Sequence, residues 1–442
     1  MFDCGCTPGV IMSIVIFEDE KVEHFLPLTY TRAIFDLRVG MYTFYQRFEK
    51  KLGKVECVVV REYLVDVYRE RLDGVRVNDL LGEGEALFLN SRLLLREDKI
   101  LRLIKEKLSN KSHFSLFVDK DPVVVYAPSK KAQEIGDALV RGDYGAFKRL
   151  CKNVGEKLEC NGKVFEYLWE LISENAKITA EDYAEYKGRE WAGEVDSRVV
   201  IYGDPSNVYI ARDAKVDAYV IIDARKGPVY IGDGARVAPG AFIEGPVYIG
   251  RESLVMPSAL IREGSNIGNV CRVGGEIEES VIQGYSNKYH AGFIGHAYIG
   301  EWVNLGAMTT NSDLKDTYGT VKVVLGDKRV DTGSRKVGCF IGDMVKTSIG
   351  TLIYTGKKIG VSSHLHGVVY EDVPSFTIYA KSLGVDLVEL YLESAIETQR
   401  RMMSRRGKVL SKAEEELIRR LFEITEKERR EAGVKKGRFI LG

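Results

Sequence analysis

A six-residue repeat in the second half of the chain constrains its fold more than any other feature. From Ile231 onward a β-branched residue recurs at every sixth position, and the series is Ile231, Val237, Ile243, Ile249, Val255, Ile261, Ile267 and Val273. A small or β-branched residue follows four positions after each member through Ile267, and Gly or Pro often fills the turn positions. A period of six is neither the period of an α-helix nor the alternation of an ordinary strand.

This repeat predicts a left-handed parallel β-helix over residues 196–375. Short parallel strands joined by tight corners would place the aliphatic side chain inside a prism and the small residue at the bend. Each strand would stack on an equivalent strand about three hexapeptides away. A β-sandwich would need a period of two, which is absent. Two interruptions, Gly275–Gly292 and Thr310–Gly338, are expected to project as loops, where binding and catalysis usually occur on a rigid scaffold.

The stretch from His290 to Ala307 carries a motif of known spacing. It reads HAGFIGHAYIGEWVNLGA, with a glycine five residues after His290, an asparagine fourteen residues after it, and then Gly-Ala. This spacing resembles the acetyltransferase half of the bifunctional glucosamine-1-phosphate acetyltransferase/N-acetylglucosamine-1-phosphate uridylyltransferase family. The resemblance implies that His290 is the general base, that Asn304 lies in the active site, and that the Ala307 backbone contacts acetyl-CoA. It also implies a phosphate-binding role for Arg262.

The residue types suit this chemistry on their own. An amine that attacks a thioester must lose a proton, and neutral histidine has a pKa suited to accepting it. A backbone N–H near Ala307 could hold the thioester oxygen as it becomes anionic. Arg262 offers a planar fork for a sugar phosphate, and Lys288 or Lys336 could add a point charge. The alternative is that His290 is a surface histidine without a chemical role.

The sequence departs from the family at two positions. Phe293 stands where the family has a tyrosine, and the segment before His290 contains Glu276 where a lysine-bearing segment is expected. These departures leave the identity of the sugar open. Glu276 is a candidate for contacting a sugar amine or hydroxyl.

The first part of the chain alternates β and α signals, which predicts a Rossmann-like α/β domain over residues 1–170. The run from Leu26 to Arg38, LPLTYTRAIFDLR, resembles the sugar nucleotidyltransferases that are fused to such β-helices. Residues 171–195 are expected to form a helical linker. Residues 376–442 have helical periodicity and a Ser411-Lys-Ala-Glu414 capping box, so they are expected to form an α-helical tail.

The phosphate-binding part of the α/β domain is altered. An acidic run, Glu18–Glu23, replaces the usual glycine-rich loop, and Asn90-Ser-Arg92 replaces an Asn-Gly-Asp metal site. No metal ligand is therefore predicted, and Mg²⁺ is implied only if this domain is active. If a nucleoside triphosphate binds, Arg92 must help, and the candidate nucleotide-binding residues are Thr29, Arg32, Arg38 and Asn90. A sugar-binding or purely structural domain is the alternative.

Composition limits the location and the partners. The chain has 64 basic and 64 acidic residues, so no global charge would attract nucleic acid or a membrane surface. No apolar run is long enough to span a bilayer, and seven scattered cysteines argue against a secreted disulfide framework. A soluble, cytoplasmic protein is expected. Cys4 and Cys6 form a weak candidate metal pair whose role stays open. The basic cluster Arg400, Arg401, Arg405 and Arg406 either meets CoA phosphates or is a solvated helix face.

Three functions remain open from the sequence. The first is acetyl-CoA-dependent N-acetylation of an amino-sugar 1-phosphate, with or without nucleotidyl transfer that gives a UDP- or dTDP-sugar. The second is a sugar-1-phosphate nucleotidyltransferase in which the β-helix serves as an oligomerisation scaffold. The third is a non-catalytic sensor of sugar nucleotides. By the family resemblance, a homotrimer with active sites between subunits is expected.

Overall fold

The computed structural model describes residues 12–79 and 84–440, so Cys4 and Cys6 lie outside the described residues. The chain divides into two units. Unit 1 comprises Met1–Val22, Ala33–Asp36 and Thr43–Glu166, and unit 2 comprises Glu23–Arg32, Leu37–Tyr42 and Tyr167–Gly442. Two short segments from the first part of the sequence therefore belong to the unit that contains the repeat.

Unit 1 contains a seven-stranded sheet of order β5-β4-β1-β6-β8-β7-β9. Its strands are β1 (Met12–Phe17), β4 (Cys57–Val59), β5 (Arg76–Val77), β6 (Glu85–Asn90), β7 (Phe114–Val118), β8 (Asp121–Ala127) and β9 (Glu156–Glu159). Strand β1 runs parallel to β4 and β6, whereas β8 runs antiparallel to β6 and β7. The helices are α1 (Phe44–Leu52), α2 (Val65–Arg71), α3 (Lys99–Ser109), α4 (Ser129–Val140) and α5 (Tyr144–Cys151). The predicted α/β fold of this part is confirmed.

The sequence of β1, MSIVIF, explains why this strand is central. Residues 13–17 are all buried, which is typical of a parallel strand covered on both faces. Strand β1 lies between β4 and β6, so the strands that follow it in sequence are added to the sheet on both of its sides. A topological switch point therefore forms at the carboxyl end of β1. The segments that follow β1 and β6, Glu18–Asp19 and Ser91–Arg92, meet at this point.

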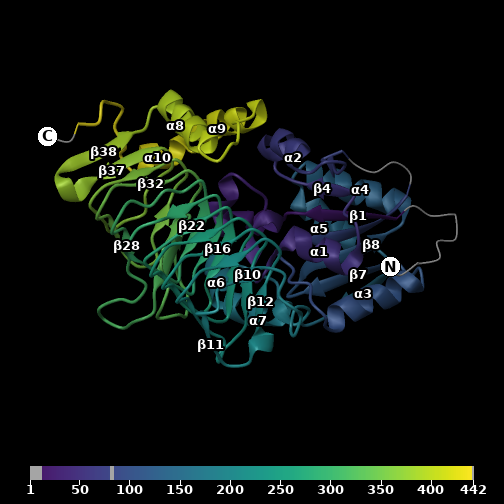
Figure 1. The fold of residues 1–442 in the computed structure, drawn as a ribbon. Coiled ribbons are helices and arrows are strands. Elements are labelled where there is room, and N and C mark those ends of the chain that lie inside the picture. Colours follow the sequence, from purple (N-terminus) through teal and green to yellow (C-terminus); the bar gives the residue numbers. More distant parts are fainter. Residues whose placement is uncertain (1–11, 80–83, 441–442) are drawn as a thin grey trace. The chain divides into compact units, whose positions relative to one another are not determined.

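Unit 2 is a left-handed β-helix, and the predicted fold class is confirmed (Figure 1). Its first sheet contains β10 (Glu194–Val195), β13 (Lys215–Val216), β16 (Arg236–Val237), β19 (Leu254–Val255), β22 (Arg272–Val273) and β25 (Asn287–Lys288). Its second sheet contains β11 (Val200–Tyr202), β14 (Ile221–Asp223), β17 (Phe242–Glu244), β20 (Leu260–Ile261), β23 (Glu276–Glu278) and β26 (Phe293–Gly295). Its third sheet contains β12 (Val208–Ile210), β15 (Val229–Ile231), β18 (Val247–Ile249), β21 (Asn266–Asn269), β24 (Val281–Gly284), β27 (Tyr298–Glu301), β31 (Phe340–Ile341) and β34 (Lys358–Ile359).

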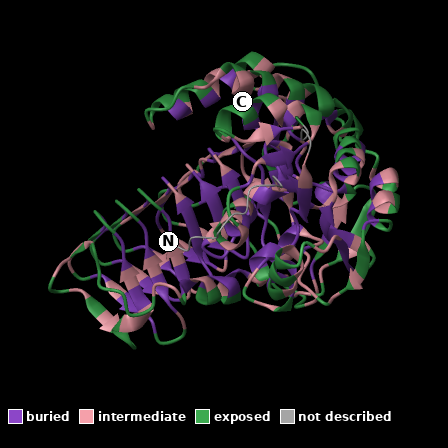
Figure 2. Ribbon diagram, turned by 90° about the vertical axis from the view of Figure 1, so that its right-hand side faces the viewer, coloured by how far each residue is buried: buried purple, intermediate pink, exposed green. Residues whose placement is uncertain are grey.

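The register of these strands produces the ladders that the repeat predicts. Val216 pairs with Val237, Val237 with Val255, and Val255 with Val273. All four side chains are buried in one continuous core, and the strands of the β-helix are largely buried in Figure 2. Later coils add β28 (Thr310–Asn311), β32 (Lys346–Thr347), β33 (Leu352–Ile353), β35 (His364–Leu365), β36 (Val368–Val369), β37 (Thr377–Ala380) and β38 (Val385–Glu389).

The two interruptions behave differently. The expectation that Gly275–Gly292 projects as a loop is wrong, because this segment contains β23, β24 and β25 and forms a coil of the prism. Its corners are shorter, but Ile277 and Ile282 keep their interior positions. The second interruption does leave the prism and forms the antiparallel hairpin of β29 (Lys322–Leu325) and β30 (Lys328–Asp331).

Helices flank the β-helix in sequence at both ends. They are α6 (Leu168–Ser173), α7 (Asn175–Tyr183), α8 (Leu392–Ser404), α9 (Lys412–Ile424) and α10 (Glu426–Glu431). The Ser411 side chain and Glu414 form the predicted capping box at the start of α9. Within the described ranges 12–79 and 84–440, we find no helix with the length and apolar character needed to cross a membrane.

Candidate functional site

His290 is exposed at the corner between β25 and β26. Its ring packs edge-on against Tyr289, with 5.1 Å between the ring centroids. The corner is fixed from inside the prism, because Lys288 Nζ donates hydrogen bonds to the carbonyl oxygens of His290 (2.6 Å) and Gly274 (3.0 Å). The backbone that carries the imidazole is therefore held while the ring itself faces solvent.

Lys288, predicted to bind substrate, occupies an interior position of the β-helix. It pairs in register with Val273, and its residue surface is only 2% exposed. Burial lowers the pKa of Lys288 to about 8, because the charged ammonium loses its hydration. The structure therefore places its amino group at the backbone of the His290 corner.

Asn304 lies one coil beyond this corner. It bridges Asn287 and Lys346 in the parallel ladder, and Asn287 Nδ2 donates to Asn304 Oδ1 (3.1 Å). Arg406 Nη2 in turn donates to Asn287 Oδ1 (2.6 Å). Because a guanidinium can only donate, this chain fixes both amides and leaves the Asn304 amide nitrogen as a donor.

Ala307 follows on the same coil and is half-buried. The N–H of Met308 donates to the carbonyl of Ala291 (2.8 Å), and the N–H of Leu305 donates to the carbonyl of Asn287 (2.8 Å). These bonds join the turn that contains Asn304 and Ala307 to the corner that contains His290. The structure thus brings the three residues of the predicted acyltransfer site onto adjacent coils.

Arg262 lies in a cluster of carboxylates on the second sheet. Its Nη1 is 2.8 Å from Glu278 Oε2 and 3.4 Å from Glu276 Oε1, and Lys336 Nζ is 3.0 Å from Glu278 Oε1. The three predicted residues Arg262, Glu276 and Lys336 therefore lie in one cluster. Glu278, which was not among the predicted residues, contacts both Arg262 and Lys336. Its position two residues after Glu276 on one strand is the signal that could have found it.

His296 lies in a buried ion-pair network. Its Nδ1 is 2.8 Å from Asp313 Oδ2, without the geometry of a hydrogen bond, and its Nε2 is 3.2 Å from Glu279 Oε2. Burial alone would lower the pKa of His296, but the two carboxylates outweigh burial and raise it to about 9. Ligand atoms of Glu278, His296 and Asp313 lie within 4.8 Å of one another. Glu278 is paired with Arg262 and Lys336, and His296 lies beside Asp313 and Glu279, so we describe this group as an ion-pair network.

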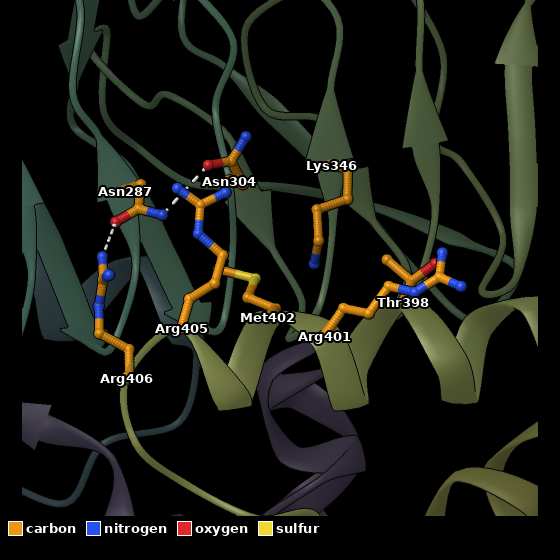
Figure 3. A pocket seen from close by; sticks show the side chains of 8 residues that line it. All are labelled: Asn287, Asn304, Lys346, Thr398, Arg401, Met402, Arg405 and Arg406. Atoms are coloured by element: carbon orange, nitrogen blue, oxygen red, sulfur yellow. Dashed lines mark hydrogen bonds between the residues drawn. The ribbon is translucent and has the colours of Figure 1, made fainter.

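A pocket of about 230 Å³ lies between the β-helix and α8, as Figure 3 shows. The described residues that line it are Asn287, Asn304, Lys346, Thr398, Arg401, Met402, Arg405 and Arg406. Neither Asp nor Glu is among them. Lys346 Nζ donates to the carbonyl oxygens of Trp302 (2.9 Å) and Met344 (2.8 Å), and burial lowers its pKa to about 7. Sequence spacing could not reveal this pocket, because α8 and the Asn304 coil are far apart in the chain.

The switch point of unit 1 contains paired charges. Arg92 Nε donates to Asp19 Oδ1 (2.9 Å), and Asn90 Nδ2 donates to Asp19 Oδ2 (2.8 Å). Asp121 contacts Lys21 (3.2 Å) and Lys148 (3.2 Å). Asn90, Asp19 and Arg92 are buried. The carboxylates are already paired with cations, so these residues do not fit a Mg²⁺ site.

The other predicted nucleotide-binding residues lie in unit 2. Arg32 forms an ion pair with Asp343 and is 3.3 Å from Glu301. Arg38 Nη1 donates to the carbonyl of Met41 (2.9 Å), and the Tyr298 hydroxyl donates to the Arg38 carbonyl (3.0 Å). Thr29 is also fully buried. Thr29, Arg32 and Arg38 therefore belong to unit 2, whereas Asn90 belongs to unit 1.

Comparison with known proteins supports both halves of the fold. A family model described as sugar nucleotidyl transferase matches residues 14–190. The bifunctional sugar-1-phosphate nucleotidylyltransferase/acetyltransferase of Sulfurisphaera tokodaii is 28% identical over 350 residues, which cover 74% of this chain and 83% of that protein. The uncharacterized acetyltransferase YaiX of Escherichia coli is 35% identical over 170 residues, covering 38% of this chain and 74% of that protein. The bifunctional protein GlmU of Methanococcus aeolicus is 28% identical over 297 residues, covering 64% of this chain and 69% of that protein.

The fold and these similarities define a transferase that combines a sugar nucleotidyltransferase-type α/β unit with a left-handed β-helix of acyltransferase type. The family resemblance inferred from the sequence is confirmed, and the roles of the residues in the His290 motif stay predictions. The chain belongs to the acetyltransferase family that includes YaiX, and it is similar to a bifunctional sugar-1-phosphate nucleotidylyltransferase/acetyltransferase over 74% of its length.

Proposed function

We propose that the protein transfers the acetyl group of acetyl-CoA to the amine of an amino-sugar 1-phosphate. The observation that carries this proposal is the His290 corner, where an exposed imidazole stands on a fixed backbone. The carbonyls of Ala291 and Asn287 in this corner accept hydrogen bonds from the N–H groups of Met308 and Leu305, on the coil of Asn304 and Ala307. The amine nitrogen attacks the thioester carbon and loses a proton to His290, and the C–S bond then breaks to give the N-acetyl sugar and free CoA thiol. Asn304 orients the acceptor, and the Ala307 N–H stabilises the developing oxyanion.

The acceptor phosphate is assigned to Arg262 by the family resemblance. In this chain, the phosphate must compete with Glu278 for the guanidinium, while Lys336 offsets part of the Glu278 charge. Glu276 is then placed to accept a hydrogen bond from the sugar. We expect this arrangement to weaken phosphate binding relative to an uncompensated arginine, so a panel of amino sugars with and without a 1-phosphate is the appropriate substrate set.

Replacement of His290 tests the assignment of the base. With acetyl-CoA and glucosamine-1-phosphate, the release of free thiol by His290→Ala should be slower by about 10²- to 10⁴-fold, because the attacking amine loses its proton acceptor. His366→Ala is a matched control, since this half-buried histidine lies on the same β-helix outside the proposed site and should retain its rate. A His290→Ala protein with the full rate would contradict the proposed mechanism.

Nucleotidyl transfer is the second activity that the family implies for unit 1. Among the described residues of unit 1, the Asp19 carboxylate at the switch point is paired with buried Arg92, which does not favour a metal-bound triphosphate there. We therefore assign acyl transfer as the activity of this chain. Release of pyrophosphate from UTP or dTTP with a sugar 1-phosphate, in the absence of thiol release, would favour the opposite assignment.

A homotrimer with its active sites between subunits is part of the proposal. It is supported by the solvent exposure of His290 and by apolar side chains exposed around β33, where Ile349 is 78%, Leu352 45% and Tyr354 54% exposed. Such a group of exposed apolar residues indicates a surface that another chain covers. We expect light scattering to give three times the mass of one chain. A monomer that is fully active would contradict a shared site.

A further inference from the structure

The pocket between α8 and the β-helix collects positive charge without an acidic counterpart in its described lining. Arg401, Arg405 and Arg406 reach it from α8 and the residues just after it, and Lys346 reaches it from β32 (Figure 3). Arg401 Nε is paired with Glu397 Oε1 (3.0 Å), which lies outside the lining. A site with this composition attracts anions.

Arg406 shows that the charge is not balanced within the pocket. Its Nη2 donates to Asn287, while its buried Nε has no hydrogen-bond partner in the described structure. Burial lowers the pKa of Arg406, and the neighbouring Arg272 and Arg405 lower it further. A buried donor without a partner is costly, and a bound anion would satisfy it.

The position of these basic residues at the carboxyl end of α8 explains only part of their arrangement around the pocket. Cations are stabilised near the carboxyl end of a helix, which accounts for basic residues in and after the last turn of α8. It does not explain why three arginines line a pocket that also contains Lys346. The solvated helix face considered in the sequence analysis applies better to Arg400, which pairs with Glu397 (2.7 Å) and Glu415 (3.0 Å).

We propose that this pocket binds the diphosphate group of the acyl donor. This assignment rests on the proposed function, because acetyl-CoA is the substrate of that reaction that carries a diphosphate. Arg401 and Arg405 stand one helical turn apart, about 6 Å along the axis, so a ligand with two linked phosphates can contact both. The volume of about 230 Å³ fits a charged group rather than a whole cofactor.

The pocket is also connected to the acyltransfer site. Arg406 donates to Asn287, and Asn287 donates to Asn304. Phosphate binding at Arg406 therefore acts on the residue that fixes the Asn304 amide. In this arrangement, α8 links binding of the donor to the orientation of a residue in the proposed catalytic site.

Calorimetric titration of the full chain with inorganic pyrophosphate and with CoA tests the pocket directly. The double variant Arg405→Ala/Arg406→Ala should bind both at least 10-fold more weakly, whereas the control Arg400→Ala should bind like the native protein. Binding should also weaken as salt concentration rises. Arg401→Ala provides a second variant if the double variant does not fold. Equal dissociation constants for the native protein and the pocket variants would overturn the proposal.

Competition identifies the source of the phosphates. CoA should displace pyrophosphate, whereas UTP and glucosamine-1-phosphate should not; displacement by UTP alone would overturn the assignment to the acyl donor. A kinetic comparison separates the two proposals: Arg405→Ala, which keeps the hydrogen bond from Arg406 to Asn287, should have a higher KM for acetyl-CoA but an unchanged KM for S-acetylpantetheine, which has no diphosphate. Suppose that the native protein turns over neither thioester, but that it binds CoA and the double variant does not. This result would contradict the proposed function and still support the pocket.

Discussion

The pKa values of two buried bases in the β-helix are shifted in opposite directions. Lys288 is enclosed among aliphatic ladders and donates to backbone carbonyls, so burial lowers its pKa to about 8. His296 is enclosed with Asp313 and Glu279, and these carboxylates raise its pKa to about 9 in spite of burial. Neutral hydrogen-bond partners leave the cost of burying a charge uncompensated, whereas carboxylates compensate for it. The folded protein therefore weakens proton binding at Lys288 and strengthens it at His296.

These two residues predict opposite dependences of stability on pH. Relative to Lys288→Met, the free energy of unfolding of the native protein should rise by about 1–3 kcal/mol as pH increases from about 8 to 10.5, because the unfolded chain binds the lysine proton more tightly. Relative to His296→Asn, it should fall by a similar amount from pH 6.5 to about 9, because the folded chain binds the histidine proton more tightly. Urea unfolding across this range measures both differences. A pH-independent difference for either variant would contradict the protonation state assigned to that residue.

At the scale of elements, an ion pair occupies the carboxyl ends of β1 and β6, where a parallel sheet usually binds its ligand. The switch point of a parallel sheet is where ligands usually bind, but in unit 1 Asp19 follows β1 and pairs with Arg92, which follows β6. Both side chains of this pair are buried, and the pair links the end of β1 to the end of β6. It gives Asp19 and Arg92 a structural contact at the switch point.

Removal of one partner of this pair should destabilise the protein. Arg92→Met leaves the Asp19 carboxylate buried and unpaired, which should cost about 3–5 kcal/mol of unfolding free energy. The double variant Asp19→Asn/Arg92→Met should recover most of that loss, because neither charge remains. Thermal unfolding of the three proteins measures the effect. A stable Arg92→Met protein that binds UTP and Mg²⁺ would show instead that the pair blocks a nucleotide site.

The elements that the sequence predicts well are those with a strong local period. The hexapeptide ladders required only local spacing, and ladder residues such as Val237 and Val255 lie in the predicted interior. The spacing at Gly275–Gly292 predicts a loop, but the structure has a coil with shortened corners, in which Ile277 and Ile282 stay inside. The pocket formed by α8 and the Asn304 coil depends on packing between distant segments, which no local spacing encodes.

At the scale of the whole molecule, the boundary between the units does not follow the sequence. Glu23–Arg32 and Leu37–Tyr42 belong to unit 2, although unit 1 continues on both sides of them. Within unit 2, these segments supply Arg32 to Asp343 and the Arg38 backbone to the hydroxyl of Tyr298. A buried carboxylate and a buried tyrosine of the β-helix therefore depend on residues from the start of the chain.

A fragment containing only residues 171–442 should be less stable than the same residues in the full chain. It retains the ladders but lacks Arg32, which leaves Asp343 without its arginine, and it exposes the surface covered by the two N-terminal segments. We expect a lower midpoint of thermal unfolding and a lower soluble yield. Arg32→Met in the full chain isolates the charge effect and should cost about 3–5 kcal/mol, whereas Arg69→Met, an exposed arginine of α2, should have little effect. A fragment as stable as the full chain would contradict this dependence.

The shared boundary also sets an order of events during protein synthesis. Arg32 leaves the ribosome long before Asp343, and at about 5–20 residues per second the interval between them is roughly 15–60 s. During that interval the two early segments have no β-helix to pack against. These two segments can therefore reach their folded contacts only after the coil that carries Asp343 has been translated, and until then their buried side chains stay exposed.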